Sequence, residues 1–118
     1  NYHPTDMSLQ LKLANAIGGL GMDAALSGLS SFIEQVDSLI LSYSSDIIPQ
    51  ISQYVQLIGN LMLIGGALNV ELSEHLFQTL LNTCNCLIIP VESSVQSERD
   101  EALYTTITCF GKLLAMES

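Results

Sequence analysis

The sequence has very few basic residues. Lys12, Arg99 and Lys112 are its only permanent cations in 118 residues, against twelve Asp and Glu, so the formal net charge is −9. Proteins that bind nucleic acids hold phosphates with clustered Lys and Arg, and anionic membrane surfaces attract the same residues. The composition therefore argues against nucleic acid and membrane as partners. It favours a protein partner that offers a basic or apolar segment.

Charged residues of both signs are also scarce, at 13% of the chain, whereas hydrophobic residues make up 48%. Soluble proteins usually have about 25% charged residues, so much of this chain must be buried internally or against a partner. The most apolar run, 55–70, contains Gln56, Asn60 and Asn69. It is shorter than the roughly 20 apolar residues that span a bilayer. A buried core helix is the better interpretation.

Residues that carry chemistry are few. The only histidines are His3 and His75. Glu71 and His75 share a helical face, but a zinc site needs three or more converging ligands. The glycine-rich segment 18–21 lacks the Gly-Lys-Ser/Thr of a phosphate loop. We therefore expect no catalytic residue, no metal and no cofactor, and predict that the protein is not an enzyme.

The three cysteines are Cys84, Cys86 and Cys109. An odd number argues against a closed disulfide framework. Cys84 and Cys86 are two residues apart, so on a helix they point in different directions. Free thiols in a reducing compartment are expected, which favours an intracellular protein of the cytoplasm or nucleus. A disulfide from Cys109 to Cys84 or Cys86 is the alternative.

Apolar residues recur at helical spacing along the whole chain, and no stretch alternates as a strand does. The pattern predicts an all-α fold of five to six antiparallel helices. Asn69 is a candidate N-cap and Pro90 a terminator. The expected helical ranges are 6–17, 22–29, 30–43, 46–68, 69–88 and 97–114.

The last expected helix has the clearest pattern. Ser97 is its candidate N-cap, with Asp100 three residues later, a variant of the capping box. Leu103, Ile107, Phe110 and Leu114 follow at spacings of four, three and four residues, which is one face of a helix. This stripe is expected to pack on a neighbouring helix.

Segment 97–107 resembles the third helix of an armadillo repeat, in which an acidic turn precedes an Ala-Leu-aromatic run. Segment 8–20 loosely resembles the same element, and the separation of about 90 residues suits two repeats of roughly 40 to 47 residues. The resemblance implies a short armadillo/HEAT-like helical array, with a compact helical bundle as the alternative. Residues 1–118 are expected to form a single domain. Because the chain begins at Asn1 without Met, it is expected to be a piece of a longer protein.

These observations favour a protein-interaction or scaffold domain that binds a partner helix or extended segment in an apolar groove. A homo-oligomer is left open. The alternative is a surface-active or lipid-binding bundle that inserts into membranes or carries lipid. The candidate partner-binding residues are Leu57, Leu61, Leu63, Phe77 and Tyr104.

Overall fold

The computed structural model describes residues 12–13, 15–17, 19–65 and 68–117. It is helical, and no strand occurs within those ranges. Of the expected first helix, residues 12–13 and 15–17 are helical and the rest lies outside the description. The long helices are α2 (Met22–Leu41), α3 (Ile48–Gly65), α4 (Val70–Leu87) and α5 (Gln96–Glu117). The all-α prediction is therefore confirmed.

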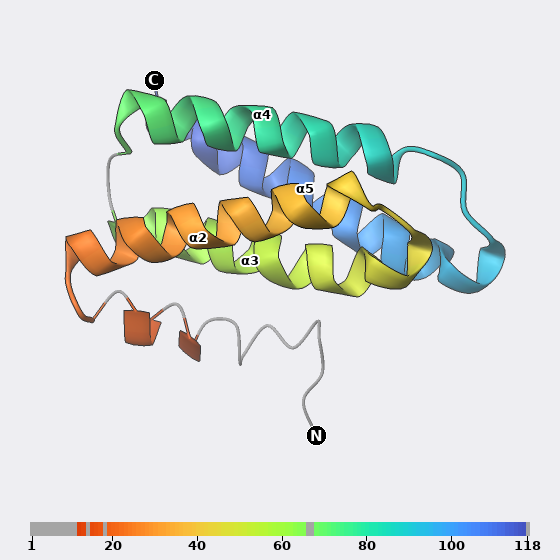
Figure 1. The fold of residues 1–118 in the computed structure, drawn as a ribbon, viewed down its shortest axis with the longest axis horizontal. Coiled ribbons are helices and arrows are strands. Elements are labelled where there is room, and N and C mark those ends of the chain that lie inside the picture. Colours follow the sequence, from red (N-terminus) through yellow and green to blue (C-terminus); the bar gives the residue numbers. More distant parts are fainter. Residues whose placement is uncertain (1–11, 14, 18, 66–67, 118) are drawn as a thin grey trace.

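The four long helices form two antiparallel hairpins, α2–α3 and α4–α5 (Figure 1). Helix α2 packs on α3 and α4, and α5 packs on α3 and α4. In Figure 1 the chain runs in the same direction along α2 and α4, and in the opposite direction along α3 and α5. One hairpin therefore lies on the other, so that α2 packs against α4 and α3 packs against α5.

The two hairpins share one internal layout. A 3₁₀ turn, Ser45–Ile47, leads into α3, and a second, Ser93–Val95, leads into α5. Helix α4, the second turn and α5 each begin 48 residues after α2, the first turn and α3. Pro49 lies in the first turn of α3, where its missing N–H leaves no helical bond unmade.

Expected helices 22–29 and 30–43 are one continuous helix, α2. The separation at Ser30 was wrong, because Ser at this point continues the helix and caps nothing. At the start of α4 the cap prediction is confirmed, since Asn69 Oδ1 accepts a hydrogen bond from the Leu72 N–H at 2.7 Å. Helix α5 begins at Gln96, so Ser97 lies within its first turn and does not precede it.

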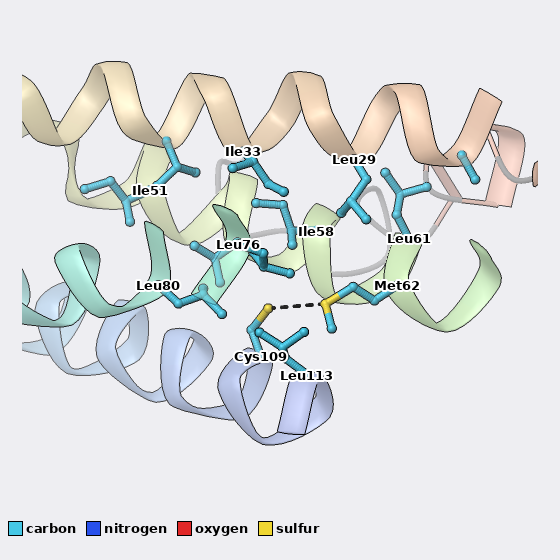
Figure 2. Close-up of a cluster of buried hydrophobic side chains, with 13 residues drawn as sticks. Leu29, Ile33, Ile51, Ile58, Leu61, Met62, Leu76, Leu80, Cys109 and Leu113 are labelled. Carbon is cyan, nitrogen blue, oxygen red and sulfur yellow. Dashed lines mark hydrogen bonds between the residues drawn. The ribbon is translucent and has the colours of Figure 1, made fainter. Parts of the chain in front are cut away.

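All four long helices contribute to one apolar core. Figure 2 shows Leu29 of α2, Ile58 of α3, Leu76 of α4 and Leu113 of α5 pointing into a common cluster, in which each is fully buried. The thiol of Cys109 lies 3.8 Å from Met62 Sδ in the same cluster. This core makes both hairpins parts of one packed unit.

Helix α5 faces the core with a different stripe from the one expected. The buried residues are Ala102, Thr106, Cys109 and Leu113. Each lies one residue before a member of the predicted stripe, which rotates the buried face by about 100°. The predicted stripe, formed by Leu103, Ile107, Phe110 and Leu114, therefore lies beside the core-facing side of the helix.

Candidate functional site

Helix α4 has two adjacent apolar faces. Leu76, Leu80 and Leu87 are buried in the core. Phe77 and Leu81, one residue further along, remain 42% and 39% exposed. The opposite flank of α4 contacts α2, because His75 and Thr79 both bond to Asp37. Phe77 and Leu81 thus lie on the side of α4 that faces away from α2.

The second apolar face of α5 meets that of α4. Ile107 and Leu114 are each 56% exposed, while Leu103 and Phe110 are half-buried. The rings of Phe77 and Phe110 pack edge to face, with centroids 5.3 Å apart and an interplanar angle of 80°. This contact joins the two stripes into one surface. We call it the α4–α5 face; its members are Phe77, Leu81, Leu103, Ile107, Phe110 and Leu114.

Single exposed apolar side chains are common on protein surfaces. The α4–α5 face differs because its members are aromatic and branched aliphatic, lie in stripes along two helices, and are joined across the helices by the Phe77–Phe110 contact. Contiguous apolar patches of this kind mark sites of contact with another molecule. The α4–α5 face is therefore the candidate functional site.

Two acidic residues and one basic residue, Arg99, border the face. Glu74 precedes Phe77 by three residues, and Asp100 precedes Leu103 by three, so each continues a stripe of the face. Both are exposed. Asp100 Oδ1 accepts a hydrogen bond from Arg99 Nε at 2.9 Å. Arg99 itself points back to α4, where Nη1 donates to the Leu87 carbonyl at 3.0 Å.

The predicted partner-binding residues are not brought together. Leu57 and Leu61 are 1% and 0% exposed, so a partner that docks on this conformation cannot touch them. Their positions on an unusually apolar helix reflect burial in the core. The side chain of Leu63 lies outside the description. Phe77 belongs to the α4–α5 face, whereas Tyr104, 72% exposed, lines a separate cleft between α3 and α5.

Sequence reasoning missed Leu81 and did not foresee that Ile107 and Leu114 are exposed. A signal was present in α4, where Phe77, Leu81, Cys84 and Ile88 recur at spacings of four, three and four beside the core stripe. Two neighbouring apolar stripes on one helix cover a wider arc than a single packing partner buries.

The polar cluster between α2 and α4 joins the two helices by hydrogen bonds. Asp37 Oδ2 lies 2.7 Å from His75 Nε2, and Thr79 Oγ1 donates to Asp37 Oδ1 at 2.7 Å. His75 thus pairs with Asp37, and the Glu71 pairing considered from the sequence is not what this conformation shows. Asp37 is the shared acceptor, so His75 does not take the hydroxyl proton of Thr79 as a catalytic base would.

Cys84, Cys86 and Cys109 are free thiols. Burial raises the pKa of each, that of Cys109 to about 12, with the nearby Lys112 opposing the rise. All three are therefore neutral near pH 7, the form in which a thiol is weakly nucleophilic. No group of three or more His, Cys, Asp or Glu in the described ranges could hold a metal ion.

None of the helices in the described ranges combines the length and hydropathy needed to cross a bilayer. The chain matches no protein-family model, no curated protein and no solved structure.

Proposed function

We propose that this chain is a protein-interaction module that seats an amphipathic helix with basic flanks on the α4–α5 face. The observation that carries the proposal is the exposure of Phe77, Leu81, Ile107 and Leu114 on the two stripes that the Phe77–Phe110 contact joins. An apolar helix face laid into this surface would remove these side chains from water.

The arrangement of the hairpins supports a helical occupant. Helical repeat arrays such as armadillo and HEAT proteins grow by stacking one helical hairpin on the last, and an uncovered end leaves a packing surface. Here the hairpins stack at a 48-residue spacing, and the α4–α5 face lies on the second hairpin. A partner helix would occupy the position that a further hairpin takes in such an array.

Charge supports basic flanks. Glu74 and Asp100 border the face, and the chain carries a net charge of −9. A basic partner is attracted at long range, and its Lys or Arg side chains can pair with the border carboxylates. The same net charge disfavours a second copy of this chain as the occupant, since two copies repel each other.

The test uses a four-turn amphipathic peptide, about 15 residues long, with Leu and Phe on one side and Lys on both flanks. A matched peptide carries Glu in place of Lys. Fluorescence anisotropy should show tighter binding of the basic peptide. The double variant Leu81→Asp, Ile107→Asp should weaken that binding by at least about tenfold, because two apolar contacts worth more than 1.4 kcal/mol together are lost.

The control variant is Ser31→Asp, since Ser31 is exposed on α2 away from the face. It adds a negative charge and should bind the basic peptide at least as well as the wild type. Equal binding by the double variant and the wild type would refute the proposal. A different pattern would instead support the lipid-binding alternative. In that case the wild type binds zwitterionic vesicles but neither peptide, and the double variant no longer binds the vesicles.

A further inference from the structure

A second surface lies between α3 and α5. It is a cleft of about 230 Å³, lined by residues of those two helices alone. Its buried floor includes Val55, Gly59 and Cys109. None of its lining residues belongs to the α4–α5 face. The cleft is thus a separate site with its own polar groups.

One of those polar groups lacks a partner. Gln56 lines the cleft and is only 9% exposed. Its Oε1 atom is buried and accepts no hydrogen bond from any described residue. A buried carbonyl oxygen without a donor is unfavourable. An occupant of the cleft that offers an N–H group would remove this penalty once the Gln56 amide turns to present Oε1 to the cleft.

The two charged residues of the cleft are the first and the last of its lining residues on α5. Glu101 and Lys112 are eleven residues apart on α5, a rise of about 16 Å. Neither forms a salt bridge within the described residues. Lys112 lies against α3 because residue 59 is glycine: a Cβ there would be 3.3 Å from Lys112 Nζ. The ammonium and the carboxylate are therefore both available to an occupant.

This spacing fits an extended chain. A strand advances about 3.3 Å per residue, so two residues four apart are separated by about 13 Å and point to the same face, and their long side chains cover the rest of the distance to Glu101 and Lys112. Between the two ends, the amide side chains of Gln56 and Asn60 and the hydroxyls of Thr105 and Thr108 can meet a peptide backbone, which carries one donor and one acceptor per residue.

We infer that the α3–α5 cleft binds an extended peptide segment of a partner protein. The segment carries a basic side chain at the Glu101 end and a carboxylate four residues away at the Lys112 end. A backbone N–H of the segment donates to Gln56 Oε1. The inference goes beyond the proposed function, because the cleft shares no residue with the α4–α5 face and takes an extended occupant in place of a helix.

The experiment is an NMR titration of the ¹⁵N-labelled full chain at low salt with terminally blocked five-residue peptides. Two of them, Lys-Ala-Val-Ala-Glu and Glu-Ala-Val-Ala-Lys, carry opposite charges, in both chain directions. Two controls, Lys-Ala-Val-Ala-Lys and Glu-Ala-Val-Ala-Glu, carry like charges. The better opposite-charge peptide should bind about three to five times more tightly than either control. It should shift the amide signals of Gln56, Asn60, Thr105 and Thr108.

Two variants sharpen the result. Lys112→Glu makes both ends acidic, so the two-lysine peptide should become the tightest ligand. Gln56→Met removes the unpartnered oxygen at similar volume, and should weaken the opposite-charge peptides about fivefold while raising the melting temperature. Ser31→Ala, exposed on α2 and part of neither surface, should leave all four affinities unchanged.

Equal affinities for all four peptides, or signal shifts confined to the α4–α5 face, would overturn the inference. So would an unchanged order of affinities in Lys112→Glu. None of these outcomes bears on helix binding at the α4–α5 face, so the two proposals fail separately.

Discussion

At the scale of single residues, buried threonines explain where the sequence was misleading. Thr106 is fully buried in α5, and its hydroxyl donates to the Ala102 carbonyl at 2.7 Å. Thr83 is buried in α4 and donates to the Thr79 carbonyl at 2.7 Å. Because each threonine hydroxyl forms a hydrogen bond within its own helix, neither hydroxyl is left unpaired when it is buried. Hydropathy alone does not reveal this, so Thr106 was not predicted to be in the core.

Cys109 makes the stability of the fold depend on alkaline pH. Burial raises the pKa of its thiol from 9.0 to about 12. The unfolded chain therefore loses this proton first as the pH rises. The free energy of unfolding is unaffected by Cys109 below about pH 9 and should fall between pH 9 and about 12. Urea unfolding measured at intervals of pH from 7 to 11 checks this.

The control is Cys109→Ala, which has no proton to lose. Its free energy of unfolding should be lower at pH 7, since a buried sulfur is removed, and should fall less steeply above pH 9. Some alkaline loss remains, because burial also raises the pKa of Tyr43, Cys84 and Cys86. Identical slopes for the two proteins would show that the Cys109 thiol is not responsible.

At the scale of helices, the helical type was predictable, whereas the continuity of α2 and the buried face of α5 were not. Asn69 marks the start of α4 through the chemistry of capping, but the expected start of the next helix back, at 46, lies in the 3₁₀ turn that precedes α3. In α5 the most hydrophobic stripe, with Ile107 and Leu114, is not the most buried one. Periodicity identifies apolar faces but not which neighbour covers each, since that depends on tertiary packing.

The same limit explains the candidate site. Phe77, Leu57 and Leu61 are all predicted to bind a partner, but only Phe77 is exposed, and Leu57 and Leu61 are buried. The three residues differ in how exposed they are, and their exposure depends on how the two hairpins stack. Tyr104 lies on another side of α5, so large apolar and aromatic residues of one helix need not lie on the same surface.

Gly111 offers a prediction for α5. It lies inside the helix and is exposed, and a Cβ there would meet nothing within 4 Å. Gly111→Ala should therefore raise the free energy of unfolding by about 0.5–1 kcal/mol, because Ala loses less backbone entropy in a helix. The midpoint of urea unfolding should rise with an unchanged denaturant slope.

Gly28→Ala is the matched comparison in α2. Its Cβ would lie 3.3 Å from Ile17 Cγ2 and 3.7 Å from Leu61 Cδ1, so neighbouring side chains must move. The cost of moving these side chains should partly or wholly cancel the gain in the free energy of unfolding that Ala brings through its higher helix propensity. An equal gain in both variants would mean that the close packing around Gly28 is not constraining.

At the scale of the whole molecule, α3 is the most enclosed element. It packs on α2 and α5, and Ile51, Val55, Ile58 and Leu61 are each 0% exposed. Among its described side chains only Gln50 is exposed. The α4–α5 hairpin, by contrast, keeps an apolar face in contact with water. The two hairpins thus share a layout but differ in how much of each is covered.

This difference predicts the order of local opening. Amides of residues 52–62 in α3 should exchange with solvent only on global unfolding, because opening α3 breaks its contacts with both α2 and α5. Amides near the end of α5, 110–116, should exchange through smaller openings, since one side of that segment is uncovered. Native-state hydrogen exchange by NMR at low urea concentrations measures both free energies. Equal or greater protection in α5 would show that the stability of the bundle is not centred on α3. Added basic helical peptide should slow exchange in both segments, because every opening that disrupts the α4–α5 face, global unfolding included, then also costs the binding free energy.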